Sequence, residues 1–255
     1  MAQARPYYAE KGLSAAFYDT VTAADARLQG DVEIYAGLAP PGGSVLELGA
    51  GTGRIAFALA ERSLSVTGVE IAPAMLGQAL ARRAELPPAA AERVAFLRGD
   101  MTSLDLKRRF DLVVCGYFTL AHVPRGAAWR NTFGAAARHL DAGGLAAFHL
   151  PLVDVMRLPA PADLGLPVLD QPTPGGGRLL LYLRERSFRE AIGRLDQVIE
   201  YVELDARGAA LRRSRERLTY YWTDPQPLAE AAGLDLDRPP IPLGGVGEIW
   251  VFRKA

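Results

Sequence analysis

Cysteine is nearly absent from this sequence, since Cys115 is the single one among 255 residues. One cysteine cannot form an internal disulfide, and it excludes a zinc site built from a cysteine cluster. Long apolar runs are missing too, because no stretch approaches the roughly 20 residues that a membrane-spanning helix needs. The beginning, MAQARPYYAEKG, lacks the apolar core of a signal peptide. These absences predict a cytoplasmic protein that has no metal site and no membrane span.

An excess of charge of either sign is also missing. Lys plus Arg amounts to 29 and Asp plus Glu to 29. Such a balance provides no overall field that would attract nucleic acid or an anionic membrane surface, so neither is expected as a partner. Hydrophobic residues make up 49%, which together with the length predicts one α/β domain with an insertion and a sizeable core.

Apolar runs alternate with helical patterns over the first 150 residues. The runs that predict strands are 44–49, 65–70, 93–100, 110–117 and 145–150. They are continuous rather than alternating, which is typical of a parallel sheet covered by helices on both faces. The pattern predicts a doubly wound, Rossmann-like architecture.

The pattern changes after residue 150. A stretch rich in Pro and Gly predicts a loop, and three alternating runs then predict an antiparallel β meander. We therefore expect four segments: an N-terminal helical lid, a ligand-binding core, an inserted loop and meander, and a C-terminal helix and strands that complete the core sheet. Their bounds are 1–40, 41–150, 151–224 and 225–255.

The most informative stretch is VLELGAGTGRIAFALAERS, which joins a predicted strand to a predicted helix. Gly49, Gly51 and Gly53 lie at this junction. Ligands of parallel sheets bind beyond the carboxyl ends of the strands, and glycine lets a ligand approach the backbone closely. Glu70 ends the next strand, where a carboxylate can accept hydrogen bonds from two ribose hydroxyls. The arrangement predicts a nucleoside ligand.

The glycine spacing argues against a nicotinamide dinucleotide. Arg54 occupies the place of the last glycine in the dinucleotide pattern G-x-G-x-x-G. Glu47, two places before the first glycine, would repel a pyrophosphate and would suit a ligand with an ammonium group. An oxidoreductase is therefore disfavoured.

Four motifs together resemble the class I S-adenosylmethionine-dependent methyltransferases, in their small-molecule branch. VLELGAGTGR resembles the first motif, VTGVEIAPAML the second, RGDMTSL the third, and FDLVVCGYFTLAHV the fourth strand with its exit. The resemblance implies a seven-stranded sheet with an antiparallel last strand, and S-adenosylmethionine as cofactor. Tyr18 in FYDTV resembles an aromatic residue that closes over this cofactor. The cofactor-binding residues that the resemblance implies are Tyr18, Glu47, Gly49, Ala50, Gly51, Gly53, Glu70, Ile71, Asp100, Met101, Cys115 and Tyr117.

The predicted reaction is a displacement in which an acceptor atom takes the methyl group. A base is needed only where that atom carries a proton, and the candidates are His149, His122 and Tyr18. His139, before a turn, is expected to be a helix-end residue.

The meander is expected to cover the site or to form a homodimer contact. A covered site suits a small acceptor that is methylated on N or O. Two alternatives stay open: a methyltransferase of RNA or protein, and a non-catalytic S-adenosylmethionine-binding protein.

Overall fold

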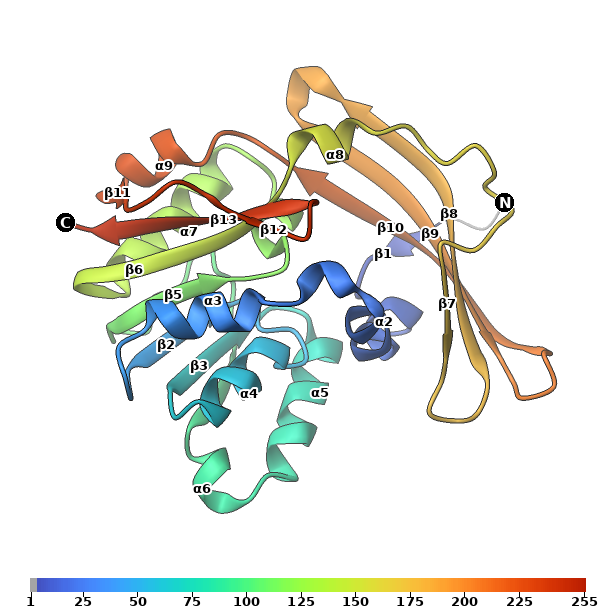
Figure 1. Cartoon of the computed structure of the whole chain (residues 1–255), viewed down its shortest axis with the longest axis horizontal. Helices are drawn as coiled ribbons and strands as arrows, with labels where there is room; N and C mark the ends of the chain where they lie inside the picture. Colours follow the sequence, from blue (N-terminus) through green and yellow to red (C-terminus); the bar gives the residue numbers. More distant parts are fainter. Residues whose placement is uncertain (1–3) are drawn as a thin grey trace. The chain divides into compact units, whose positions relative to one another are not determined.

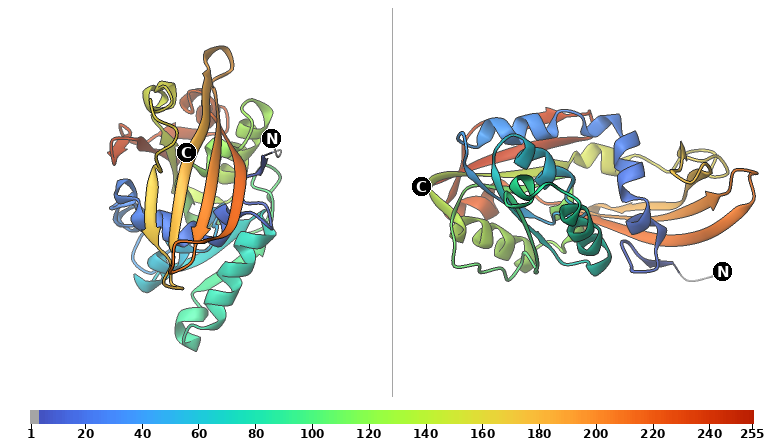
Figure 2. Two further views of the ribbon diagram at one scale, coloured as in Figure 1. Left: turned by 90° about the vertical axis from the view of Figure 1, so that its right-hand side faces the viewer. Right: turned by 90° about the horizontal axis from the view of Figure 1, so that it is seen from below.

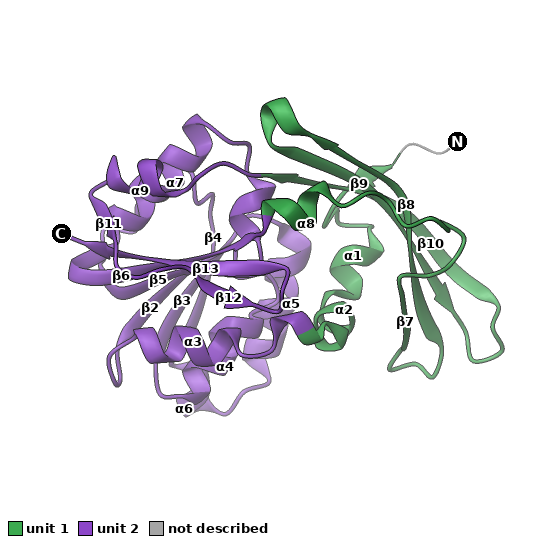
Figure 3. Ribbon diagram, turned by 45° about the horizontal axis from the view of Figure 1, so that its top comes forward, with its two compact units in different colours: residues 1–26, 153–221 green, residues 27–152, 222–255 purple. Residues whose placement is uncertain are grey.

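The chain forms two compact units in a computed structural model that describes residues 4–255 (Figure 3). Unit 1 comprises residues 1–26 and 153–221, and unit 2 comprises residues 27–152 and 222–255. The expected N-terminal segment, 1–40, is divided between them at residue 26, and its residues 1–3 lie outside the described part. None of the helices formed by the described residues is long and apolar enough to cross a membrane.

Unit 2 is built on an eight-stranded sheet (Figure 1). Seven strands follow one path: β11 (Leu234–Leu236), β13 (Gly247–Lys254), β6 (Leu140–Pro151), β5 (Phe110–Cys115), β2 (Ser44–Leu48), β3 (Ser65–Glu70) and β4 (Val94–Arg98). The eighth, β12 (Ile241–Leu243), pairs with β13. Neighbours from β4 to β6 are parallel, and β13 runs antiparallel to β6. The predicted doubly wound sheet with an antiparallel last strand is confirmed.

Helices cover both faces of this sheet, as the continuous apolar strands predict. Val45 and Val114 belong to the core on the side of α3, α4 and α5, whereas Leu46 and Val113 belong to the core on the side of α7 and α9. The α-helices of unit 2 are α3 (Asp31–Leu38), α4 (Arg54–Glu61), α5 (Pro73–Ala84), α6 (Pro88–Ala91), α7 (Ala127–Arg138) and α9 (Gln226–Glu230). Two 3-10 helices are η1 (Ala26–Leu28), which begins at the boundary of the units, and η2 (Thr119–His122).

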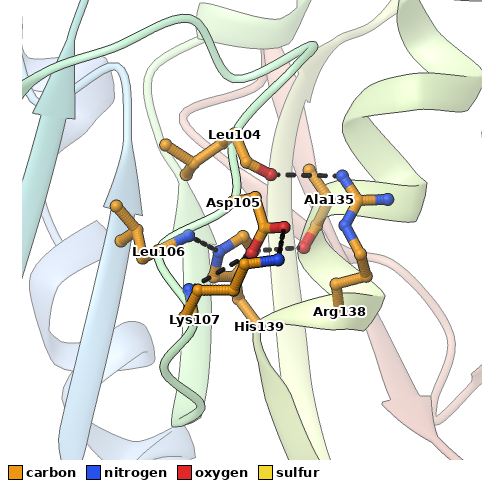
Figure 4. Close-up of polar contacts among 7 residues, drawn as sticks. All are labelled: Leu104, Asp105, Leu106, Lys107, Ala135, Arg138 and His139. Atoms are coloured by element: carbon orange, nitrogen blue, oxygen red, sulfur yellow. Dashed lines mark hydrogen bonds and ion pairs between the residues drawn. The ribbon is translucent and has the colours of Figure 1, made fainter.

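The end of α7 is tied to the segment that follows β4 (Figure 4). The backbone N–H of Leu106 donates to Nε2 of His139 (2.8 Å), so the proton of the neutral ring lies on Nδ1, 2.7 Å from the carbonyl oxygen of Ala135. Arg138 donates to the carbonyl oxygen of Leu104 (3.1 Å). These contacts make His139 a helix-end residue with both ring nitrogens occupied.

Strand β6 begins earlier than expected. It starts at Leu140 and includes the sequence DAGG, which predicts a turn. The pairing with β5 shifts register between Phe110–Leu140 and Leu112–Leu145. The extra residues are therefore accommodated as an irregularity within the strand, and not as a loop that precedes it.

Unit 1 contains a separate five-stranded sheet, seen face-on in the left view of Figure 2. Its order is β1 (Arg5–Pro6), β10 (Ala210–Tyr221), β9 (Arg194–Leu204), β8 (Arg178–Arg189) and β7 (Leu169–Pro172). Strands β7 to β10 are antiparallel, which confirms the extra antiparallel sheet. Its role as a substrate cover or dimer contact stays a prediction.

Short elements accompany this sheet. They are α1 (Leu13–Ala16), α2 (Tyr18–Ala24), α8 (Val153–Arg157) and η3 (Glu190–Ile192). Helix α8 and strand β7 lie in the stretch for which the sequence predicts only a loop, because its many Pro and Gly residues hide two elements of five residues or fewer.

A buried carboxylate fastens α1 to this sheet. Glu216, on β10, accepts hydrogen bonds from the backbone N–H groups of Leu13 (2.7 Å) and Ser14 (3.2 Å), from the hydroxyl of Ser14, and from the hydroxyl of Ser214 (2.6 Å). Gly12 precedes the helix without a capping side chain, and a Cβ there would lie 2.8 Å from Glu216. Glu216 thus supplies the cap that the helix itself lacks.

Replacing this carboxylate should destabilise unit 1. In Glu216→Ala four donors lose their acceptor in a buried place, so we expect the free energy of unfolding to fall by about 3 kcal/mol. Urea unfolding measures this change. The matched control is Glu185→Ala, which removes an exposed carboxylate of the same sheet that pairs with Arg215 at 3.4 Å. It should cost less than about 1 kcal/mol, and equal losses in the two variants would refute the anchoring role.

Candidate functional site

The predicted site residues of unit 2 gather at one edge of its sheet. Strands β2 to β6 are parallel, so their carboxyl ends share that edge. The structure places Glu47 and the glycine loop at the end of β2, Glu70 and Ile71 at β3, Asp100 and Met101 after β4, Cys115 and Tyr117 at β5, and His149 near the end of β6. Their individual roles stay predictions.

The glycine loop adopts a backbone that favours glycine. Gly49, Gly51 and Gly53 have φ values of 73°, 59° and 87°. A Cβ at Gly49 would lie 2.2 Å from the Thr119 side chain, and the N–H groups of Gly49 and Ala50 donate to the carbonyl oxygen of Val69. The turn itself therefore requires these glycines. The argument for a ligand must come from the polar groups beside them.

Glu70 holds the loop in place. Its carboxylate accepts the N–H of Gly51 at 2.9 Å and the N–H of Ala72 at 2.7 Å. These bonds connect the end of β3 to the glycine loop and to the start of α5. Each oxygen retains a second lone pair, which is what the predicted contact with ribose hydroxyls needs.

Glu47 is a buried carboxyl with an unsatisfied oxygen. Its exposed fraction is 2%, and within residues 4–255 its Oε2 has no hydrogen-bond partner. Burial raises the pKa of Glu47 to about 8; the charge of Arg54 opposes this shift, and those of Asp31 and Glu70 add to it. A buried acceptor that lacks a donor fits the ammonium group of the predicted cofactor.

An ion pair that the sequence analysis did not assign lies beside Glu47. Arg54, the first residue of α4, donates from Nη1 and Nη2 to the two oxygens of Asp31, at 3.1 and 2.5 Å. Asp31 is the first residue of α3. Tyr35 follows one turn later, is fully buried, and its hydroxyl has no partner in the described part of the chain. The pair fastens α3 to the helix that follows the glycine loop.

The exits of β3 and β4 are open to solvent. Ile71 is 56% exposed, which is high for an apolar side chain beside a buried carboxylate. Asp100 accepts the N–H and the hydroxyl of Thr102, both at 2.8 Å, and this fixes its carboxylate in the turn. Met101 lies near the loop, since a Cβ at Gly49 would be 3.4 Å from its terminal methyl.

The exit of β5 has an unusual backbone. Tyr117 and Phe118 have φ values of 44° and 58°, in the left-handed region that large side chains rarely adopt. Cys115, which ends β5, is fully buried, and burial raises the pKa of its thiol to about 12. Only the neutral thiol or the backbone of Cys115 is therefore available for contact near neutral pH.

The surroundings of the two candidate histidine bases, His149 and His122, do not favour their protonation. His149 is fully buried, and neither ring nitrogen has a partner among the described residues. Burial lowers the pKa of His149 to about 4, and burial has the same effect on the pKa of His122 in η2. Tyr18 belongs to unit 1, where its ring packs edge-on against Tyr8 at 5.9 Å.

Metal ligation receives no support from the residues that the structure describes. No group of three or more His, Cys, Asp or Glu side chains among them is arranged to hold a metal ion.

Comparisons with known proteins agree with this geometry. Residues 45–144 match a family model described as a methyltransferase domain. No curated protein matches. The CcbJ methyltransferase from Streptomyces caelestis is 23% identical, with 98% of each chain covered and a TM-score of 0.74.

Two further solved structures are similar over almost the whole chain. S-adenosylmethionine-bound CalS10, an amino pentose methyltransferase from Micromonospora echinaspora, is 21% identical, with 93% of this chain and 96% of that chain covered and a TM-score of 0.69. The sugar N-methyltransferase KedS8 from a Streptoalloteichus species is 22% identical, with coverage of 100% and 98% and a TM-score of 0.70. At these identities the likeness establishes the fold of both units.

Glu70 should contribute strongly to cofactor binding. Glu70→Ala removes the predicted acceptor of the ribose hydroxyls, so the affinity for S-adenosylhomocysteine should fall by about 1.5–3 kcal/mol, as measured by calorimetry. Glu85→Ala, a change at an exposed carboxylate just after α5, is the control and should bind normally. An unchanged affinity in Glu70→Ala would exclude the ribose contact.

Glu47 should make cofactor binding depend on pH. A carboxyl whose pKa is about 8 in the ligand-free protein is mostly protonated at pH 6, and it must lose its proton before it can pair with an ammonium group. The association constant for S-adenosylhomocysteine should therefore rise by up to about tenfold per pH unit from pH 6 to 8. In Glu47→Gln the constant should be low and flat over this range. A slope that survives this substitution would assign the titration to another group.

Proposed function

We propose that this chain is an S-adenosylmethionine-dependent methyltransferase that methylates an amine nitrogen of a small molecule; the methyltransferase domain matched at 45–144 and the fold support this. CalS10 and KedS8 are described as methyltransferases of an amino pentose and of a sugar nitrogen, and those descriptions belong to those proteins. They support an amino sugar as the first acceptor to test.

The choice of nitrogen rests on His149, which is fully buried and has no hydrogen-bond partner among the described residues that would make it a stronger base. His149 has no carboxylate partner within residues 4–255, and burial lowers the pKa of His149 and of His122 to about 4. A hydroxyl acceptor must lose a proton during transfer and needs an effective base. A neutral amine brings its own lone pair, so an amine suits this site better.

The chain's own residues bind and align the reactants. S-adenosylmethionine supplies a methyl group on a positively charged sulfur. The lone pair of the amine forms the new N–C bond while the C–S bond breaks and its electron pair goes to sulfur. The ammonium product then loses a proton to water. Glu47 would hold the ammonium group of the cofactor and Glu70 its ribose, and such alignment is the main contribution of the protein to the rate.

A matched pair of acceptors tests the proposal. Glucosamine and glucose differ in an amino group in place of a hydroxyl, and incubation with S-adenosylmethionine should methylate glucosamine alone, as detected by mass spectrometry. The rate should rise with pH as the substrate ammonium loses its proton, and it should level off above the pKa of that amine. His122→Ala should lose less than about tenfold.

Three results would contradict amine methylation. Turnover of glucose but not of glucosamine or of amino sugars that carry the nitrogen at other carbons would favour O-methylation. Methyl transfer to RNA or protein, with none to these amines, would favour a macromolecular acceptor. Cofactor binding without transfer to any of these acceptors would favour a non-catalytic binding protein.

A further inference from the structure

His149 and Phe118 form a contact that the proposed reaction leaves unexplained. The two rings lie 4.5 Å apart at an angle of 54°. Phe118 is half-buried and His149 is fully buried, and neither nitrogen of His149 has a hydrogen-bond partner among residues 4–255. Buried polar atoms in proteins are nearly always paired. Two unpaired nitrogens on one buried ring therefore make His149 a candidate contact for a polar ligand.

Phe118 reaches this position through a strained turn. Both Tyr117 and Phe118 adopt positive φ, and the turn is closed by hydrogen bonds from Thr119 N to Gly116 O (3.0 Å) and from Ala121 N to Phe118 O (2.9 Å). Successive left-handed residues without glycine are costly, and such strain concentrates at sites that bind or switch.

Gly247, which begins β13, leaves the space that both rings occupy. A Cβ there would lie 2.4 Å from Cε1 of Phe118 and 2.6 Å from Nε2 of His149. The next residue of the turn, Thr119, lies against Gly49 of the glycine loop. The Phe118–His149 contact is thus adjacent to the loop that is predicted to hold the cofactor.

We propose that Phe118 covers His149, and that the acceptor amine displaces this ring and donates an N–H hydrogen bond to a ring nitrogen of His149. The inference rests on the proposed amine acceptor. It makes His149 a residue that contacts the substrate, and Phe118 a positioning residue that controls access to it.

This contact would orient the amine without taking its proton. A neutral imidazole has one nitrogen that accepts a hydrogen bond and one that donates. An amine that gives one N–H to His149 keeps its lone pair available for the methyl carbon. The charged groups that act on His149 are Asp31, on α3, and Arg54, on α4, which have opposite effects on its protonation.

Each position of Phe118 carries a cost. With the ring over His149, the turn is strained and two nitrogens lack partners. With the ring displaced, its packing on His149 and Gly247 is lost. A ligand that forms a hydrogen bond with His149 shifts the equilibrium toward the displaced position of Phe118. The smaller the fraction of protein in that open position, the weaker the apparent affinity for the ligand.

Steady-state kinetics tests whether Phe118 covers His149. The acceptor is glucosamine, or whichever of the tested amino sugars shows the highest turnover. Phe118→Ala removes the ring, and Phe118→Leu is the control that keeps an apolar cover. If Phe118 blocks access to His149, Phe118→Ala should lower KM for the amine about three- to tenfold, because the amine no longer has to displace the ring. Phe118→Leu should lower it little.

The same pair of variants is then made in His149→Gln. His149→Gln should raise KM for the amine and leave the affinity for S-adenosylhomocysteine unchanged, which also shows that the protein is folded. In this background Phe118→Ala should no longer lower KM. A residue with a purely structural role would give the same KM change with and without His149.

Nuclear magnetic resonance provides a second readout, because the chain has only three histidines. The ring signals of His149, assigned with His149→Gln, should shift when the amine is added to the wild-type complex with S-adenosylhomocysteine. Phe118→Gly, which also relieves the positive φ, replaces Phe118→Ala if the latter does not fold.

The outcomes separate the cover from the proposed function. An amine that is methylated with equal KM by wild type and Phe118→Ala, or whose binding leaves the His149 signals unmoved, overturns the cover alone. Absence of methylation of every amine by the wild type overturns the proposed function, and with it the contact to His149.

Discussion

The carboxylate of Glu70 is the constraint on which the edge of the unit 2 sheet depends. It receives backbone N–H groups from Gly51 and Ala72 and so fixes the glycine loop relative to β3 and α5. The loop in turn sets where α4 begins, and Arg54 at its start holds Asp31 and with it α3. The positions of the glycine loop, α4 and α3 therefore all depend, directly or through one another, on the side chain of Glu70.

The fold of unit 2 could be predicted because each of its signals is local. The run 65–70 is a strand with the expected bounds, and Pro73 begins α5 as its fixed φ favours. The short elements could not be predicted, because pairing partners far away in the chain decide them. Strand β1, with two residues, exists through its parallel pairing with β10, and β12 exists through its pairing with β13.

The candidate site also has a part that the sequence predicts and a part that only the structure reveals. Motif spacing points to Gly49, Gly51, Gly53 and Glu70, and the structure gathers them at one sheet edge. The contact of Phe118 with His149 and Gly247 has no such signal, because the three residues come from the turn after β5, from β6 and from β13, and they meet only in the folded protein. The left-handed backbone of Tyr117 and Phe118 is also invisible in the sequence, since neither residue is glycine.

Two buried side chains at this edge, Glu47 and His149, are kept largely uncharged by their surroundings. Near pH 7 Glu47 is largely protonated, because burial raises its pKa to about 8, and His149 is neutral, because burial lowers its pKa to about 4. The two shifts have one cause, which is that a buried charge without a partner is costly. A ligand that brings an ammonium group would supply the partner that lets Glu47 ionise. A neutral amine beside His149 would need no such change.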